Sequence, residues 1–306
     1  MSVNGNHKDT KITKNSTRHF SLCAFLCVLC VLCVFVADVA SAAPTAKPAR
    51  VASLNLAADE VLAEILPVER LVGVTALVDE RGTSNALGRV PASVPRFPKA
   101  DLERLLSVRP DLVIVSEYTD ADFLKLLEQS GVRHHRMKGL ASLAGIRQAV
   151  LELGAAVGEP EAAGRLIARF DGTLRQLETR LRGASRPRVL YWAGGLTAGG
   201  GTAIGSLVEC GGAVNVGSEM GLKGIEPVGA ERAYAAAPDR ILVGEGWESA
   251  TALSRHPLLS QLTAVREGRL VTMPTELLVA LNHHSAGACW DLAHRLHPDR
   301  VPAQAP

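Results

Sequence analysis

Two stretches of this sequence, ERLLSVRPDLVIV at residues 103–115 and ERAYAAAPDRILV at residues 231–243, share one pattern. Each begins with a Glu-Arg pair, reaches a Pro-Asp dipeptide and continues into an apolar run. The offset between matched residues is 128 throughout, from 103 to 231 and from 110 to 238. The pattern predicts a short helix, a turn and a buried strand of a parallel sheet. Because it occurs twice, we expect two similar lobes.

Strands and helices alternate around each copy of the repeat. The expected strands lie near 50–55, 70–76, 111–116, 188–192, 240–244 and 269–273. The expected helices lie near 57–66, 101–108, 120–130, 203–210, 230–236, 255–263 and 283–296. A weaker similarity between the halves is the Arg-Val pair at the start of the first expected strand of each, Arg50-Val51 and Arg188-Val189. This alternation predicts an α/β protein with two Rossmann-like lobes, each with a parallel sheet covered by helices.

A long helical stretch separates the two halves. Pro160 can open a helix at its first position. Apolar residues then recur at spacings of four, four, three and four, which places them on one helix face; they are Leu166, Phe170, Leu174, Leu177 and Leu181. A helix over residues 160–182 would span roughly 35 Å at about 1.5 Å per residue. We expect a rigid connection between lobes, and the alternative is an ordinary crossover helix of one large sheet.

The expected organisation has four segments. Residues 1–42 are typical of an export signal peptide, with basic residues, an apolar run at 20–36 and a small-residue cleavage motif at 40–42. The alternative is an uncleaved anchor. The N-terminal lobe is expected at 43–141, the connecting helical segment at 142–183 and the C-terminal lobe at 184–300. Since no cysteine follows the cleavage motif directly, we expect no lipid anchor and a mature protein free in solution in the periplasm. We also expect a monomer.

The charge balance argues against a nucleic acid partner. Removal of residues 1–42 takes away four of 33 basic and two of 31 acidic residues, which leaves 29 of each. Phosphate binding requires a clustered basic excess, and no such cluster follows residue 43.

Two cysteines, Cys210 and Cys289, remain after the expected cleavage. An oxidising compartment favours a disulfide between two such thiols if their backbones can approach. The alternative is a pair of buried free thiols that act as small apolar groups.

Across residues 50–298 the sequence resembles the substrate-binding proteins of ABC importers for cobalamin, haem and ferric siderophores. Four segments, taken in this order, carry the resemblance, at 50–54, 101–114, 230–239 and 264–271. The resemblance implies two α/β lobes joined by one long helix, and transport rather than catalysis. Cys210 and Cys289 look like the cysteine positions of cobalamin-binding members, which strengthens the disulfide prediction.

The resemblance also implies a partner, an ABC permease dimer in the inner membrane. In the family, one carboxylate on each lobe docks onto permease arginines, and Glu103 and Glu231 occupy those positions. Charged contacts at matching places give registry and fast association. The alternative role of each glutamate is to stabilise a helix N-terminus, which is worth less than about 1 kcal/mol.

Ligands of two-lobed α/β proteins bind in loops after the carboxyl ends of strands. These loops hold candidate binding residues, several of them aromatic, whose flat faces could hold a macrocycle; they are Asn55, Phe97, Tyr118, Trp192 and Trp247. The resemblance matches Phe97 to a ligand-wall position of cobalamin-binding members. We therefore expect a small-molecule cobalt or iron chelate as ligand and no resident cofactor.

Three residues are candidate ligands for the metal of such a chelate. His283 and His284 lie where the last expected helix begins, and imidazole could bind haem iron, occupy the lower face of cobalamin or hydrogen-bond a siderophore. A solvated pair is the alternative. Tyr118 is the third, because a phenolate binds ferric haem, and stacking at a strand end is its alternative role.

Two other functions remain open from the residues. A binding protein for a bare metal ion would need three or four converging His, Asp or Glu ligands, and only His283 and His284 come near. An exported α/β enzyme is the other alternative. No Gly-x-Ser-x-Gly, His-Glu-x-x-His or complete phosphate-loop motif follows residue 43.

Overall fold

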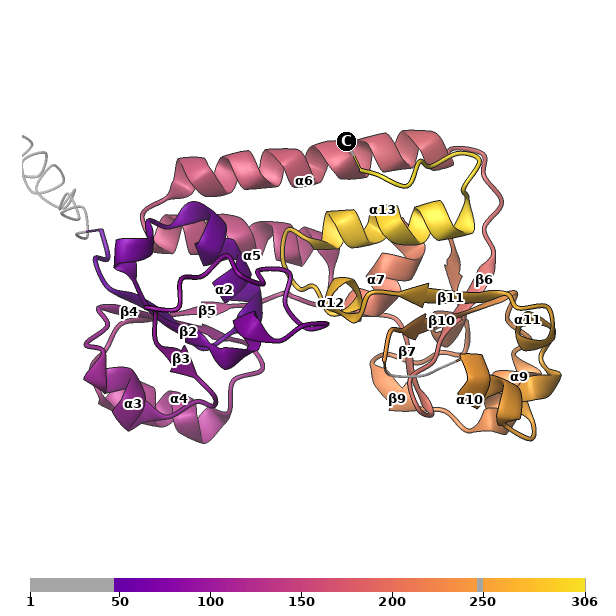
Figure 1. Cartoon of the computed structure of the whole chain (residues 1–306), viewed down its shortest axis with the longest axis horizontal. Coiled ribbons are helices and arrows are strands. Elements are labelled where there is room, and N and C mark those ends of the chain that lie inside the picture. Colours follow the sequence, from indigo (N-terminus) through magenta and orange to yellow (C-terminus); the bar gives the residue numbers. More distant parts are fainter. Residues whose placement is uncertain (1–46, 247–249, 306) are drawn as a thin grey trace, which may run out of the picture. The chain divides into compact units, whose positions relative to one another are not determined.

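The computed structural model describes residues 47–246 and 250–305, and two parallel sheets organise this part of the chain (Figure 1). The first has the order β3-β2-β1-β4-β5, from β1 (Val51–Ser53), β2 (Leu71–Thr75), β3 (Arg96–Phe97), β4 (Leu112–Ser116) and β5 (His134–Met137). The second has the order β11-β10-β6-β8, from β6 (Arg188–Tyr191), β8 (Val214–Asn215), β10 (Arg240–Gly244) and β11 (Leu270–Met273). Every neighbouring pair in both sheets is parallel. The two-lobed α/β fold class is confirmed, while the expected signal peptide at 1–42 lies outside the described residues.

Helices cover both faces of each sheet. On the first sheet, α2 (Leu56–Ile65), α5 (Leu143–Ala156) and α6 (Pro160–Leu181) share one core, and α3 (Leu102–Ser107) and α4 (Ala121–Gln129) share another. On the second sheet, α6, α7 (Ala203–Cys210) and α13 (Ser285–Leu296) share one core. The core on its other face includes α8 (Val216–Glu219), α9 (Ala230–Ala235), α10 (Ala250–Arg255) and α11 (Thr263–Arg266). Two antiparallel strands, β7 (Leu196–Ala198) and β9 (Ile225–Pro227), and the short α12 (Thr275–Leu278) complete these elements.

The helix expected at 255–263 is instead broken into α10, a 3₁₀ turn at Leu259–Gln261 and α11. Pro257 explains the interruption, because proline lacks the N–H that would continue the helix and disfavours the helical conformation of the residue before it.

The aspartates of the repeated Pro-Asp turns make equivalent contacts in the two lobes. Asp111 accepts a hydrogen bond from the backbone N–H of Arg50 at 3.1 Å, and Asp239 accepts one from the backbone N–H of Arg188 at 2.8 Å. Both arginines open the first strand of their lobe. Each repeat copy therefore ties the start of one strand to the start of its neighbour.

The residue before each Pro-Asp turn is also equivalent. Arg109 and Ala237 have φ of 47° and 43°, and they are the non-glycine residues with positive φ in the described chain. Their carbonyl groups accept hydrogen bonds from the guanidinium groups of Arg50 and Arg188, each at 2.9 Å. A left-handed conformation at a non-glycine residue is uncommon, and its occurrence at both positions shows that the repeat extends to the backbone.

Helix α6 contributes to the cores of both lobes. Leu166, Ile167 and Phe170 are 2–3% exposed and belong to the first lobe's core. Leu177, at 1% exposure, belongs to the second lobe's core, and the half-buried Leu174 packs against both. Figure 1 shows α6 running past both sheets. Since burial of each large apolar side chain stabilises by about 1.5–3 kcal/mol, α6 is held firmly at both ends.

Asp59 of α2 is a fully buried carboxyl group in the first lobe. Its Oδ2 accepts hydrogen bonds from the backbone N–H and the hydroxyl of Thr75, at 3.0 and 2.6 Å, and its Oδ1 has no hydrogen-bond partner. Burial raises the pKa of Asp59 to about 7. The group is therefore protonated in the folded protein under mildly acidic conditions.

The two cysteines of the described chain lie close together but are not joined. Cys210, at the end of α7, is half-buried, and Cys289 of α13 is buried; both are free thiols. Burial raises the pKa of Cys289 well above its usual value, and a hydrogen bond with Cys210 raises it further. The structure holds both cysteines as free thiols, and the disulfide between them stays a prediction.

We expect Asp59 to make folding stability depend on pH. A carboxyl pKa that is higher in the folded state than in the unfolded state stabilises below the unfolded value, and this contribution is lost as the pH rises through about 7. The loss is at most about 4 kcal/mol, at about 1.4 kcal/mol per pKa unit. Urea unfolding of the wild type and Asp59→Asn from pH 4 to 8 measures it. An unchanged difference between the two proteins across this range would contradict the assignment.

We also expect mild oxidation to link Cys210 to Cys289. The bond would close a loop of tens of residues and stabilise the fold by about 2–4 kcal/mol. Peptide mapping under non-reducing conditions, together with unfolding curves with and without reductant, measures both effects. Cys210→Ser is the control that should remove the reductant dependence. Two alkylatable thiols at these positions after oxidation would refute the pairing.

Candidate functional site

An apolar cavity of about 370 Å³ lies between the two lobes. The first lobe lines it with Tyr118, which follows β4, and with Ala141. The second lobe lines it with residues 201–204 at the start of α7 and with Ile225 of β9. The end of α12 and the segment that follows it supply the remaining wall, Leu278, Val279 and Leu281.

Large apolar side chains are unusually exposed at this cavity. Tyr118 is 65% exposed and Ile225 is 55% exposed. They come from opposite lobes, so a ligand that enters the cavity would cover both. Exposed apolar surface in a concave site is typical of a small-molecule binding site. Although the Tyr118 side chain is largely exposed, partial desolvation of the phenol raises its pKa, and the neighbouring Glu117 raises it further. The phenol is therefore neutral at neutral pH.

A smaller cavity of about 90 Å³ adjoins the apolar one, and the two share Val279 and Leu281. Asn55 lines the smaller cavity from the loop between β1 and α2. Its side-chain oxygen accepts a hydrogen bond from the backbone N–H of Ala57 at 2.9 Å, which caps α2. Asn55 therefore lines this cavity, and its cap also fixes the start of α2.

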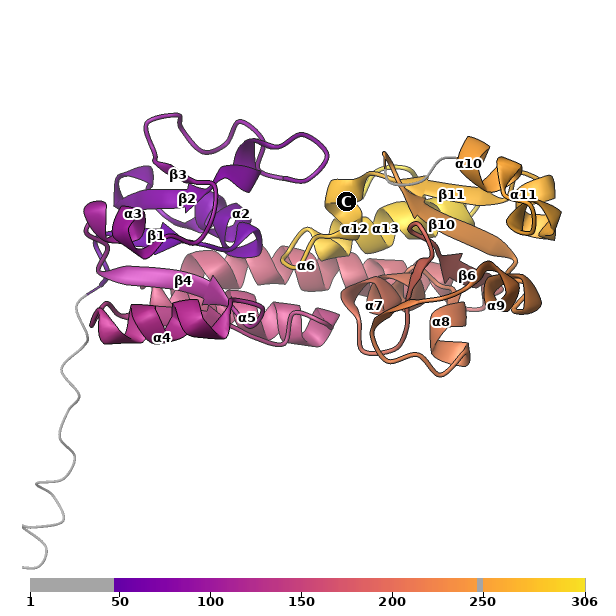
Figure 2. The same ribbon diagram turned by 90° about the horizontal axis from the view of Figure 1, so that it is seen from below.

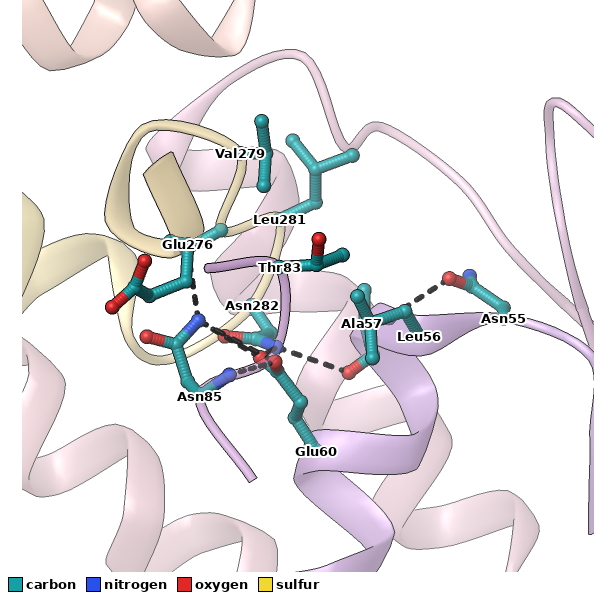
Figure 3. A pocket seen from close by; sticks show the side chains of 11 residues that line it. Asn55, Leu56, Ala57, Glu60, Thr83, Asn85, Glu276, Val279, Leu281 and Asn282 are labelled. Atoms are coloured by element: carbon teal, nitrogen blue, oxygen red, sulfur yellow. Dashed lines mark hydrogen bonds between the residues drawn. The ribbon is translucent and has the colours of Figure 1, made fainter. Parts of the chain in front are cut away.

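Glu60 is the centre of the polar network beside this cavity (Figure 3). Its carboxylate accepts hydrogen bonds from the backbone N–H of Asn85 and from the Asn282 side chain, each at 2.6 Å. Asn85 also donates to the backbone carbonyl of Glu276 at 3.0 Å. Glu60 is 2% exposed, and burial raises its pKa. The network joins α2 to the segment around α12, which carries the cavity wall.

Sequence reasoning missed Glu60 and its partners. The signal available was an Asp-Glu pair flanked by apolar residues of the expected helix, at 59–60. Acidic residues are almost never fully buried without partners, so a pair at this place indicates a polar network. The identity of the partners, 222 residues away in the case of Asn282, could not be read from the sequence.

His283 and His284 do not line either cavity. They lie beside Glu64, one turn beyond Glu60 on α2, with His283 Nε2 at 3.0 Å and His284 Nε2 at 3.9 Å from Glu64 Oε1. The hydrogen bond with His283 lowers the pKa of Glu64 to about 2. Burial lowers the pKa of His284 to about 3. The histidines are therefore neither a solvated pair nor part of the cleft.

The structure corrects two of the predicted cleft aromatics. Phe97 is 2% exposed and its ring lies against Gly73, where an added Cβ would meet Cε2 at 2.3 Å. Trp192 is 6% exposed in a core of the second lobe. Both lie at the carboxyl ends of strands, but their side chains turn into the cores rather than the cleft. Trp247 lies outside the described residues.

Glu103 and Glu231 are exposed residues in the first turns of α3 and α9. Figures 1 and 2 show that α3 and α9 both lie away from α6, on the opposite side of the sheets. Glu103 and Glu231 thus lie in the first turns of helices that face away from α6 in both lobes.

Glu64, His283 and His284 form the sole group of three or more potential metal ligands found among residues 47–246 and 250–305. In that same part of the chain, no helix is both long and apolar enough to cross a membrane.

Comparisons with known proteins agree with this architecture. Residues 51–277 match the family model described as periplasmic binding protein. A cobalamin-binding protein of Halobacterium salinarum is 24% identical over 201 residues, which cover 64% of this chain and 54% of that protein. The match therefore spans about half the length of this curated relative.

Two solved structures show the same fold. The apo form of the periplasmic haem-binding protein RhuT from Roseiflexus sp. RS-1 has a TM-score of 0.71 and 23% identity, covering 83% of this chain and 99% of that one. A periplasmic haem-binding protein from Pseudomonas aeruginosa has a TM-score of 0.68 and 25% identity, covering 85% and 96%. With two parallel-sheet lobes, a cavity between them and a family match over most of its length, this chain belongs to the periplasmic binding protein family.

Proposed function

We propose that this protein captures a metal chelate in the cavity between its lobes and delivers it to an ABC permease. The ligand is a cobalt or iron chelate: cobalamin, haem or a ferric siderophore. The observation that carries the proposal is the apolar cavity lined from both lobes, with Tyr118 and Ile225 exposed. Cobalamin and haem each present the flat faces of a macrocycle, so burial of these side chains against such a face would contribute to the affinity. The relatives whose names specify haem or cobalamin support this ligand class.

A bare metal ion fits the cleft less well. It would require several His, Asp or Glu ligands that converge within the cavity. The His-Glu group of the described chain lies outside both cavities. Within the apolar cavity, Tyr118 is the residue whose oxygen could reach a metal centre, and it would act on a chelate rather than on a free ion.

The protein works as a binding protein in the periplasm, to which the segment 1–42 would direct it. Because α6 packs into both lobes, we propose that ligand binding closes the cleft only modestly. The permease dimer would meet the face that carries α3 and α9, with Glu103 and Glu231 paired to its arginines. Two equivalent carboxylates on similar lobes offer matching contacts to two equivalent subunits.

We expect cobalamin, haemin or a ferric siderophore to bind the purified protein and change its tryptophan fluorescence. Tyr118→Ala and Ile225→Asp should each weaken binding about 10-fold or more, since each removes an apolar contact worth about 1.5–3 kcal/mol. Tyr234→Ala is the matched control, because Tyr234 is 42% exposed on α9 away from the cavity. Equal affinity of all four proteins for the bound chelate would rule out this cavity as the site.

A separate substitution tests metal coordination by Tyr118. Tyr118→Phe keeps the ring and removes the oxygen. If the oxygen binds iron, the variant should lose the haem absorbance typical of a phenolate ligand. An unchanged spectrum with unchanged affinity would show that the ring only stacks.

Docking predicts a different result for the glutamates. Glu103→Ala combined with Glu231→Ala should impair uptake by cells while chelate affinity and folding stability stay close to wild type. The control is Glu161→Ala with Glu178→Ala, which removes two exposed carboxylates from α6 instead. Uptake assays with the cognate permease decide the matter. Normal transport by the first double variant would exclude docking through these residues.

A further inference from the structure

A cluster of three side chains joins the first lobe to the start of the last helix, away from the cleft cavities. Glu64 belongs to α2, and His283 and His284 immediately precede α13. The nitrogen Nε2 of His283 is 3.0 Å from Glu64 Oε1, and Nε2 of His284 is 3.9 Å from it. One potential ligand atom from each residue lies within 4.8 Å of the others.

The cluster leaves buried nitrogen atoms without partners. The His283 side chain is only 8% exposed, and its Nδ1 has no hydrogen-bond partner. The buried Nε2 of His284 lacks one as well. Most buried polar atoms in proteins are hydrogen-bonded, so each exception requires an explanation. A cation bound to Nε2 of His284 would satisfy that nitrogen, since imidazole nitrogen is the commonest metal ligand in proteins. His283 would bind the same ion through Nε2, the nitrogen that faces Glu64.

We propose that Glu64, His283 and His284 bind a divalent transition-metal ion of the zinc type. Two imidazole nitrogens and one carboxylate oxygen are a common zinc ligand set, with water in the fourth position. Zinc holds such atoms at about 2.0–2.2 Å, so two atoms on one ion lie within about 4.2 Å of each other. The separations from Glu64 Oε1 to both histidines already meet this limit.

The site is distinct from the cargo site. None of its three residues lines the apolar cavity or the smaller polar one. The ion would be a resident of the protein that links α2 to the segment before α13, and this inference goes beyond the proposed transport function. Because the ion binds only the folded arrangement, it should stabilise the fold.

Two arginines bear on the affinity of the site. Arg89 Nη1 is 2.7 Å from Glu64 Oε1, the oxygen that faces the histidines, whereas Arg169 Nη2 is 3.3 Å from Oε2. The Arg89 side chain is 51% exposed, so it can turn into solvent at little cost. An incoming cation would displace Arg89 and leave Arg169 in place. Removal of Arg89 should therefore strengthen metal binding, which a purely structural ion pair would not predict.

Calorimetric titration of metal-stripped protein without a histidine tag, with Zn²⁺ as the probe, tests the proposal. We expect one equivalent to bind and the melting temperature to rise. Glu64→Gln and His283→Ala should each weaken binding at least about 10-fold, since even outer-shell partners contribute about 10- to 100-fold. Arg89→Gln should tighten it. His134→Ala with His135→Ala, which removes the other adjacent histidine pair, should leave it unchanged.

Several results would overturn the proposal. These are no Zn²⁺ binding by folded wild-type protein, unchanged binding by folded Glu64→Gln, or weaker binding by Arg89→Gln. Circular dichroism establishes that each variant is folded. Tyr118→Ala should keep its zinc affinity even where it loses the chelate. The two sites can therefore fail independently, and a protein that binds zinc but no chelate would refute only the proposed transport function.

Discussion

The packing of α6 into two separate cores is the constraint on which the rest of the structure depends. Leu166, Ile167 and Phe170 belong to the core of the first lobe, Leu177 to that of the second, and Leu174 contacts both. Any large rotation between the lobes would pull apolar side chains of one helix out of a close-packed interior, where lost contacts are expensive. Both walls of the cleft are therefore anchored to one helix, which supports the proposal that ligand binding closes the cleft only modestly.

Polar contacts also connect the first lobe to the segment before the last helix. The buried carboxylate of Glu60 binds Asn85 of the first lobe and Asn282 near the last helix, and so holds in place the segment that carries Val279 and Leu281. Glu64 and the two histidines repeat this connection one helical turn further along α2. Two residues one turn apart on α2 therefore contact the segment before α13. Glu60 binds Asn282 beside the cavities, and Glu64 lies against the two histidines of the proposed cation site.

Whether a predicted site residue lines a cavity or is buried depends on how its side chain is directed at the end of a strand. Asn55 and Tyr118 line cavities beside the strand ends, because the carboxyl ends of parallel strands meet at one edge of a sheet. Phe97 and Trp192 also lie at the carboxyl ends of strands, but their side chains are buried. The direction of a large aromatic side chain at a strand end depends on which space the packing leaves open. For Phe97, that space is the one above Gly73, whose lack of a side chain admits the ring.

The sequence by itself determined the two α/β lobes, the helix between them and the equivalence of Glu103 with Glu231. These features depend on local signals, such as apolar periodicity and a Pro-Asp turn whose aspartate binds the backbone of the neighbouring strand. Only the tertiary structure decided which aromatics reach the cavity, that Glu60 meets Asn282, and that the two histidines face Glu64. Those contacts join residues more than 200 positions apart. They depend on how the packed helices position their side chains in space, and a local sequence pattern does not predict this.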